Sequence, residues 1–206
     1  MHRQSGAVLV LSGPSGAGKS SLINKIYEYV GDCYFSISTT TRPMRAGEEH
    51  GVHYYFVSEE EFKKDIEQEF FLEYAIVHGN YYGTSIKPVK EALSAGQLVI
   101  FDIDVQGNTA INNRLGDITT SVFITPPTLS ELKRRLENRS TDSLEVIEGR
   151  IKMAKREMQR ISEYDYVIVN ENLDKAADLL KLIAITARIK MSNIEINDFM
   201  LKWEDI

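Results

Sequence analysis

A glycine-rich segment between an apolar run and a helical pattern constrains this chain more than any other feature. The residues Gly13-Pro-Ser-Gly-Ala-Gly-Lys19-Ser20 match the pattern G-x-x-x-x-G-K-[ST] at every fixed position. They follow the apolar run 7–11, which predicts a buried strand, and they open the helical pattern 19–30. Glycines at such a turn let successive backbone N–H groups point inward at phosphate oxygens. The segment therefore predicts a phosphate-binding loop. The alternative is a glycine-rich strand-to-helix turn without a ligand.

Two residues of this loop carry the expected chemistry. Lys19 is placed to reach the β- and γ-phosphate oxygens of a nucleoside triphosphate, and the Ser20 hydroxyl can hold Mg²⁺. A second acidic element, Asp102 and Asp104, follows the apolar run 98–103. Carboxylates at the carboxyl end of a parallel strand face the ligand crevice of α/β proteins, so Asp102 is expected to organise the water shell of Mg²⁺. The alternative interpretation is a pair of helix-capping or turn-forming aspartates.

The alternation of strands and helices predicts the fold class. Continuous apolar strands at 7–11, 98–103, 121–124 and 166–169 are typical of a parallel sheet buried on both faces. Further strands are expected at 34–38 and 53–57, and helices at 19–30, 59–68, 88–95, 129–138, 144–161 and 174–190. We expect an α/β core, a parallel sheet flanked by helices.

Two segments interrupt this alternation. Residues 36–87 are rich in Tyr, Thr, Gly and His and contain short strands of antiparallel character, whereas 126–160 are almost entirely helical. The helical segment is basic, although the whole chain has a net charge of −6. We interpret both as ligand-carrying insertions. The expected division is a core of 1–35, 88–125 and 161–190, the two insertions, and a tail of 191–206 with no assigned role.

Composition excludes several other classes. The 206 residues are 43% hydrophobic and 26% charged, as in ordinary globular proteins. A net charge of −6 disfavours binding to a long nucleic acid backbone. The sequence contains one cysteine, Cys33, so no internal disulfide can form, and no apolar run approaches the roughly 18 residues of a membrane span. The expected location is the cytoplasm. The composition does not predict an oligomeric state.

Several motifs in sequential order make the prediction more specific. Residues 36–56, with Ser38-Thr-Thr-Thr41-Arg42-Pro-Met-Arg45, and 71–85, from Phe71 to Ser85, are the most informative. Together with the phosphate loop, the run Asp-Ile-Asp-Val-Gln-Gly from Asp102 to Gly107, the pair Pro126-Pro127 and the ending Tyr164-Asp-Tyr-Val-Ile-Val-Asn170, they resemble the guanylate kinase family. The resemblance covers about residues 5–190. It implies phosphoryl transfer from ATP to GMP with Mg²⁺, on a P-loop core with a GMP-binding insertion and a helical lid.

The resemblance also implies roles for individual residues. The GMP-binding residues would be Ser38, Arg42, Arg45, Tyr54, Glu73, Tyr82, Thr84 and Asp104. The ATP-binding residues would be Gly13, Pro14, Ser15, Gly16, Ala17, Gly18, Lys19, Ser20, Ser21 and Asn170. The catalytic residues would be Lys19, Arg42, Arg135, Arg139 and Arg150, and Mg²⁺ would be held by Ser20 and, through water, by Asp102.

Base chemistry is consistent with these roles. A Glu73 carboxylate can accept both N1–H and N2–H of guanine, and Ser38 can donate to O6, whereas adenine would leave such groups unpaired. Arg42 and Arg45 are suited to bidentate phosphate binding. Because the second pKa of a phosphomonoester lies near about 6, GMP needs no general base. Taken singly, these arginines could be solvated loop residues, Glu73 a surface residue and the tyrosines half-buried strand residues.

Two other function classes remain open from the sequence. One is a catalytically inactive guanylate-kinase-like module that binds peptides, disfavoured by the intact phosphate loop and lid arginines. The other is a P-loop kinase for a different acceptor, disfavoured by Ser38 and Glu73. The chain departs from the family pattern in the early Pro43 and in Asn138 and Ser140 beside Arg139. The apolar residues of the tail predict an amphipathic segment that packs on the core or, alternatively, at a subunit contact.

Overall fold

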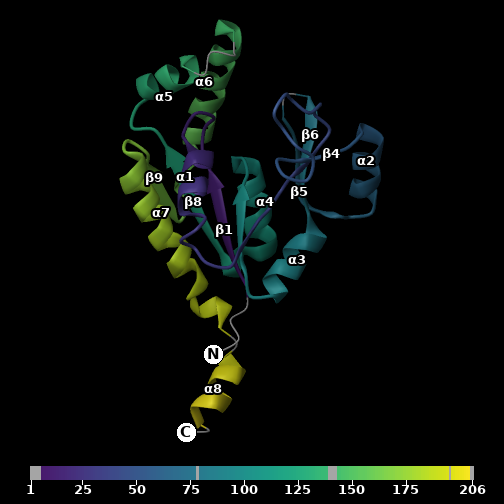
Figure 1. The fold of residues 1–206 in the computed structure, drawn as a ribbon, viewed down its shortest axis with the longest axis vertical. Coiled ribbons are helices and arrows are strands. Elements are labelled where there is room, and N and C mark those ends of the chain that lie inside the picture. Colours follow the sequence, from purple (N-terminus) through teal and green to yellow (C-terminus); the bar gives the residue numbers. More distant parts are fainter. Residues whose placement is uncertain (1–5, 78, 139–142, 195, 205–206) are drawn as a thin grey trace.

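A five-stranded parallel sheet forms the centre of the molecule (Figure 1). The computed structural model describes residues 6–77, 79–138, 143–194 and 196–204. The strand order is β2-β7-β1-β8-β9, with β1 (Ala7–Ser12), β2 (Cys33–Phe35), β7 (Leu98–Asp102), β8 (Thr119–Thr125) and β9 (Tyr166–Val169). Because β1 lies in the middle, its carboxyl end opens onto the centre of the sheet edge, where α/β proteins bind ligands.

Alternate side chains of β1 bury the two faces of the sheet. Leu9 and Leu11 pack with α1 (Lys19–Ile26) and α7 (Leu173–Arg188). Val8 and Val10 pack with α3 (Ile86–Ser94) and α4 (Val105–Leu115). Each of these four β1 side chains is fully buried, as expected for a strand covered on both faces.

A second, smaller sheet lies to one side of the core (Figure 1). Its order is β4-β3-β6-β5, with β3 (Thr39–Thr40), β4 (Tyr55–Phe56), β5 (Phe71–Val77) and β6 (Asn80–Ser85). β5 and β6 pair antiparallel, whereas β3 and β4 pair parallel. Helix α2 (Glu59–Glu67) covers this sheet through Phe62, which stacks on Phe71 with ring centroids 4.4 Å apart. Gly83 makes this contact possible, because a Cβ there would lie 2.9 Å from both rings.

Two helices occupy most of the segment 126–160. α5 (Leu129–Glu137) and α6 (Leu144–Met158) pack against each other through Leu132, Leu136 and Ile147. Both begin at side-chain caps, Thr128 for α5 and Ser143 for α6. Single 3₁₀ turns follow α4, α6 and α7 at Gly116–Ile118, Ile161–Glu163 and Met191–Asn193.

The predicted fold class is confirmed, with local differences. The expected strand 34–38 ends early, as β2 at Phe35, and β3 begins only beyond it at Thr39; the expected strand 53–57 shortens to β4. The start of the tail packs on the core, where Asn193 is fully buried and donates to the Ala187 carbonyl at 2.7 Å, whereas every described side chain of α8 (Ile196–Glu204) whose exposure is known is exposed. Over the described ranges, no helix combines the length and the apolar character needed to cross a bilayer.

Candidate active site

The phosphate loop connects β1 to α1 through backbone that only glycine adopts readily. Gly13 has φ 140°, and a Cβ there would lie 1.9 Å from the carbonyl oxygen of Ile124 on β8. Gly18 has φ 91°, and a Cβ there would lie 2.5 Å from the side-chain nitrogen of Asn170. Both glycines of the motif are thus required by close neighbours as well as by turn geometry.

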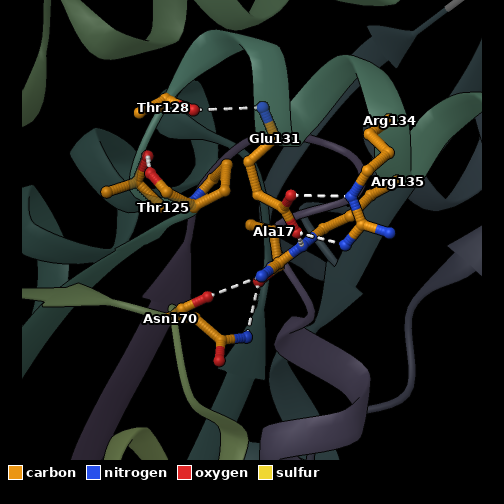
Figure 2. Close-up of polar contacts among 8 residues, drawn as sticks. Ala17, Thr125, Thr128, Glu131, Arg134, Arg135 and Asn170 are labelled. Atoms are coloured by element: carbon orange, nitrogen blue, oxygen red, sulfur yellow. Dashed lines mark hydrogen bonds and ion pairs between the residues drawn. The ribbon is translucent and has the colours of Figure 1, made fainter.

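Asn170 and Arg135 fasten the loop from two sides (Figure 2). The Asn170 side-chain nitrogen donates to the Ala17 carbonyl at 2.8 Å, and its backbone N–H donates to Thr125 at 2.7 Å. Arg135 on α5 donates to the Asn170 carbonyl at 2.8 Å and from Nε to Glu131 at 2.7 Å. The two residues therefore join the loop, the end of β9 and the lid in one polar network.

Lys19 and Asp102 form the charged centre of the loop. The Lys19 ammonium donates to the Gly13 carbonyl at 2.7 Å and lies 3.7 Å from Oδ1 of Asp102. Burial raises the pKa of Asp102, while the Lys19 charge opposes that rise. The Lys19 ammonium is therefore held over the loop before any phosphate binds.

Glu73 on β5 faces this centre from the small sheet. Thr84 Oγ1 on β6 donates to Glu73 Oε1 at 2.6 Å, and Thr84 itself is fully buried. Burial raises the Glu73 pKa to about 7, with Asp104 adding to the rise and the Thr84 hydrogen bond opposing it. Asp104 N-caps α4, because its Oδ1 accepts the N–H groups of Gln106 and Gly107. Helix capping was the alternative interpretation of Asp104 from the sequence, and Asp104 does make these capping contacts. It also lies close enough to Glu73 to affect the Glu73 pKa.

The raised pKa of Glu73 predicts a pH-dependent stability. Between its ordinary pKa of 4.5 and about 7, the unfolded chain has released this proton and the folded protein still holds it, so stability falls as pH rises through that window. The Glu73→Gln variant has no carboxyl group at this position, so its folding stability does not fall for this reason as the pH rises. We expect its free energy of unfolding, relative to the parent without nucleotide, to increase by about 1–3 kcal/mol from pH 5 to pH 8. Urea denaturation of variant and parent at both pH values measures this difference in the free energy of unfolding.

A difference that is the same at pH 5 and pH 8 would contradict the burial assigned to Glu73. The control is Glu60→Gln, which makes the same change at an exposed position.

A cleft of about 460 Å³ brings the two walls together. The predicted residues that line it are Gly13, Pro14, Ser15, Gly16, Gly18, Lys19, Ser20, Ser38, Tyr54, Glu73, Tyr82, Asp102 and Asp104. Seven further lining residues were not predicted: Ala75, Ile76, Val77, Ile103, Gln106, Met153 and Glu157. Burial raises the pKa of Glu157, and Lys19 and Asp104 both act on it, so this α6 carboxylate belongs to the electrostatics of the cleft. No motif signalled it, because it stands among other charged residues of a helix.

Arg42 is not among the residues that line the cleft, and it pairs with an acid that was not predicted. Its Nη2 donates to both Glu48 carboxylate oxygens, at 2.7 and 3.0 Å, and its guanidinium lies 5.4 Å from the Tyr54 ring centroid. The Arg45 backbone N–H donates to Glu48 at 2.8 Å, while the Arg45 side chain is exposed. Tyr54 and Tyr82 meet edge to face, with centroids 5.9 Å apart. Glu48 therefore organises the segment that carries both arginines.

The lid arginines lie in different surroundings. Arg150 on α6 donates to Ser15 Oγ at 3.2 Å, so it reaches the phosphate loop, as Arg135 does. Arg134 is 62% exposed and pairs with Glu131, as expected for a solvent-facing residue. Ser21 is exposed on α1. Arg139 and Ser140 lie outside the described residues.

The fold and the cleft define a P-loop phosphotransferase: a phosphate loop at the centre of a parallel sheet edge faces a second wall, from the small sheet, across one cleft. Residues 5–186 match the family model described as guanylate kinase. The chain is 72% identical over 206 residues to a guanylate kinase of Sulfurimonas denitrificans, with all of both chains covered. It is 50% identical over 204 residues to one of Wolinella succinogenes, covering 99% of this chain and 95% of that one.

A solved structure agrees with these relatives. The crystal structure of guanylate kinase from Anaplasma phagocytophilum superposes with a TM-score of 0.77 at 32% identity, covering 94% of this chain and 92% of that one. The chain therefore belongs to the guanylate kinase family. The predictions of family, fold class and an ATP:GMP phosphotransferase are confirmed at this level.

Proposed function

We propose that this chain transfers the γ-phosphoryl group of ATP to GMP within the described cleft, yielding ADP and GDP. The roles proposed for the two sides of the cleft rest on one observation. Lys19 and the phosphate loop line one side of the cleft, and the Thr84-bonded Glu73 carboxyl lines the other together with Ser38. The first wall suits a triphosphate, and the second suits a guanine base.

Guanine recognition centres on Glu73. Guanine presents the N1–H and N2–H donors side by side, and an ionised Glu73 offers the matching pair of acceptor oxygens. Thr84 orients that carboxylate through Oε1, and the Ser38 hydroxyl supplies a donor for O6. Asp104 adds negative charge near the exocyclic amine. Adenine lacks an N1–H, so its binding would leave the buried Glu73 carboxylate without a donor.

The GMP phosphate would bind at Arg42 and Arg45, with the Tyr54 and Tyr82 hydroxyls. The Arg42 guanidinium has several donors in a fixed plane, which allows it to keep Glu48 and bind phosphate oxygens together. Glu48 then acts as a positioning residue, because it holds the Arg42 side chain and the Arg45 backbone at once.

This role of Glu48 predicts a selective kinetic defect. We expect Glu48→Gln to raise the KM for GMP about tenfold and to leave the KM for ATP unchanged, because losing one partner of a charged hydrogen bond costs roughly 1.5–3 kcal/mol. Steady-state kinetics with each substrate varied in turn measure the effect. Glu49→Gln, the same charge change at the exposed neighbouring position, is the control. A tenfold defect in both variants would show that net charge, not the pairing with Arg42, is responsible.

The residues present fit a magnesium ion. Ser20 and Asp102 line the same part of the cleft as Lys19, and hydroxyl and carboxylate oxygens are the donors that Mg²⁺ prefers. Ser20 would hold the ion directly, and Asp102 through water. When bound, the ion neutralises charge on the β- and γ-phosphate oxygens.

Catalysis would then consist of positioning and charge stabilisation. The GMP phosphate is already a nucleophile at pH 7. Lys19 holds the triphosphate, and Arg42, Arg135, Arg139 and Arg150 stabilise the charge of the transferring group. In this proposal residues 36–87 bind GMP, 126–160 act as the lid, and 1–35, 88–125 and 161–190 form the core, with Asn170 fixing the loop that holds ATP. The proposed location is the cytoplasm.

Product analysis tests the proposed chemistry. ³¹P NMR of the protein with ATP, GMP and Mg²⁺ should show ADP and GDP appearing in equal amounts. Chelation of Mg²⁺ with EDTA should stop the formation of both ADP and GDP. Formation of ADP with free phosphate, or no conversion by protein that binds GMP, would contradict the proposal, and the second result would favour a non-catalytic binding module.

A further inference from the structure

Helix α8 carries an apolar stripe that the molecule itself leaves exposed. Ile196, Phe199, Met200 and Trp203 follow the spacing i, i+3, i+4, i+7, which places them on one helix face. Ile196 is 51% exposed, Met200 42% and Trp203 65%. Figure 1 shows α8 projecting beyond the end of α7, away from both sheets.

An exposed helix of this length needs a covering surface. α8 has nine residues, and isolated helices shorter than about 12–15 residues are marginal in water. The helix also lies beyond residues 5–186, the part matched by the family model, so the shared catalytic fold does not account for it.

A matching stripe lies on α7. Leu182, Ile185 and Ile189 repeat at +3 and +4 on its outer face and are 60%, 43% and 61% exposed. The first and last of these residues are seven positions apart in the sequence, as are Ile196 and Trp203 on α8. Met191, 63% exposed, lies between the two stripes along the chain. One chain therefore presents two apolar stripes of equal length, and both are exposed because they do not cover each other.

We propose that α8 packs on the α7 stripe of a second copy of this chain, in a two-fold dimer that exchanges the helices. A two-fold axis makes both contacts at once, because each copy supplies one α8 and one α7. In an antiparallel register with Ile196 beside Ile189, Trp203 reaches Leu182. Glu204 then lies next to Lys181 of the other copy, whose ammonium also lies 4.2 Å from the Tyr29 ring centroid of its own chain, so opposite charges meet at the end of the contact. A second copy thus matches the stripe in both spacing and charge.

The covered area is sufficient for such a dimer. Each copy contributes seven large apolar side chains, four from α8 and three from α7. At about 100 Å² each, they approach the roughly 800 Å² per partner of a standard interface. Trp203, the aromatic side chain with the largest exposed fraction in the described part of the chain, would contribute the largest single contact, against Leu182.

The chain contains its own probe of this contact, because Trp203 is its only tryptophan. We expect light scattering after gel filtration to give the mass of a dimer. Dilution from about 100 to 0.1 µM should dissociate it and shift Trp203 emission to the red. Met200→Asp and Leu182→Asp should each raise the dimer Kd by at least about 30-fold, since Met200 lies in the middle of the contact and Leu182 packs against Trp203. Leu201→Asp, the same new charge at an exposed position on the opposite face of α8, should leave the Kd unchanged.

Three results would overturn the proposal. One is a monomer throughout this concentration range. Another is a monomer with blue-shifted Trp203 emission, which would mean that α8 folds onto its own chain. The third is a dimer that Leu182→Asp leaves intact, which would place α8 on another surface. Phosphotransfer activity is not part of this test, so the dimer and the proposed function succeed or fail separately.

Discussion

We expect Lys19→Ala to lower kcat for phosphoryl transfer by at least about 10³-fold, because a cation held over the transferring group acts mainly in the transition state. The Lys19 ammonium is already positioned by the Gly13 carbonyl at 2.7 Å and Asp102 at 3.7 Å. Little reorganisation is then required when the triphosphate binds. Quenched-flow measurement of a single turnover with saturating ATP and GMP separates this loss from weaker binding.

The same helix provides a matched control for this variant. Lys25 on α1 pairs with Asp174 at 2.6 Å on the surface, and Lys25→Ala removes the same charge without touching the cleft. We expect Lys25→Ala to keep the parent rate. If Lys19→Ala retained more than about a tenth of the parent kcat, the electrostatic role assigned to the loop lysine would be wrong.

Glu73→Gln should lower kcat/KM for GMP by about 10²–10³-fold while the KM for ATP changes little. The amide replaces one of two acceptor oxygens with an NH₂ group, which then faces a guanine N–H donor. The surrounding burial, which raises the Glu73 pKa to about 7, makes this mismatch costly. Initial rates with GMP varied at saturating ATP, and the reverse, measure the two effects.

Thr84→Val distinguishes recognition from simple loss of structure. It removes the 2.6 Å hydrogen bond to Glu73 Oε1 but keeps the side-chain volume and the carboxylate. We expect an intermediate rise in the KM for GMP, smaller than that of Glu73→Gln. Equal rises in the KM for GMP and for ATP in the Glu73 variant would refute the base-recognition role.

Features with a local cause were predictable from the sequence. Strands buried on both faces are continuous apolar runs, so β1, β7, β8 and β9 were predicted with the correct pairing type. The phosphate loop was equally evident, because its glycine and lysine positions follow from backbone geometry and phosphate chemistry within eight residues.

Features fixed by distant contacts were not predictable. Helix α4 was missed because Val105–Leu115 contains a glycine and three asparagines and little apolar periodicity. Packing on the sheet determines it: Ile111 of α4 is fully buried in a cluster with Val8 and Val10 of β1. The Asn170 contact with Ala17 likewise joins chain segments that only the fold brings together. The Arg42–Glu48 pairing spans six residues, but no motif indicated it. For α8, the periodicity indicated an amphipathic helix but not the surface that covers it.

The most direct test of the whole account is the rate of ADP release with Mg-ATP and each of GMP, AMP, CMP, UMP and dTMP in parallel. The arrangement of Glu73, Ser38 and Thr84 predicts fast release with GMP and rates lower by about 10⁴-fold with AMP. Similar rates with GMP and AMP would contradict the assignment of Glu73 as the guanine acceptor. Release with none of the five, from folded protein that binds GMP, would contradict phosphotransfer itself.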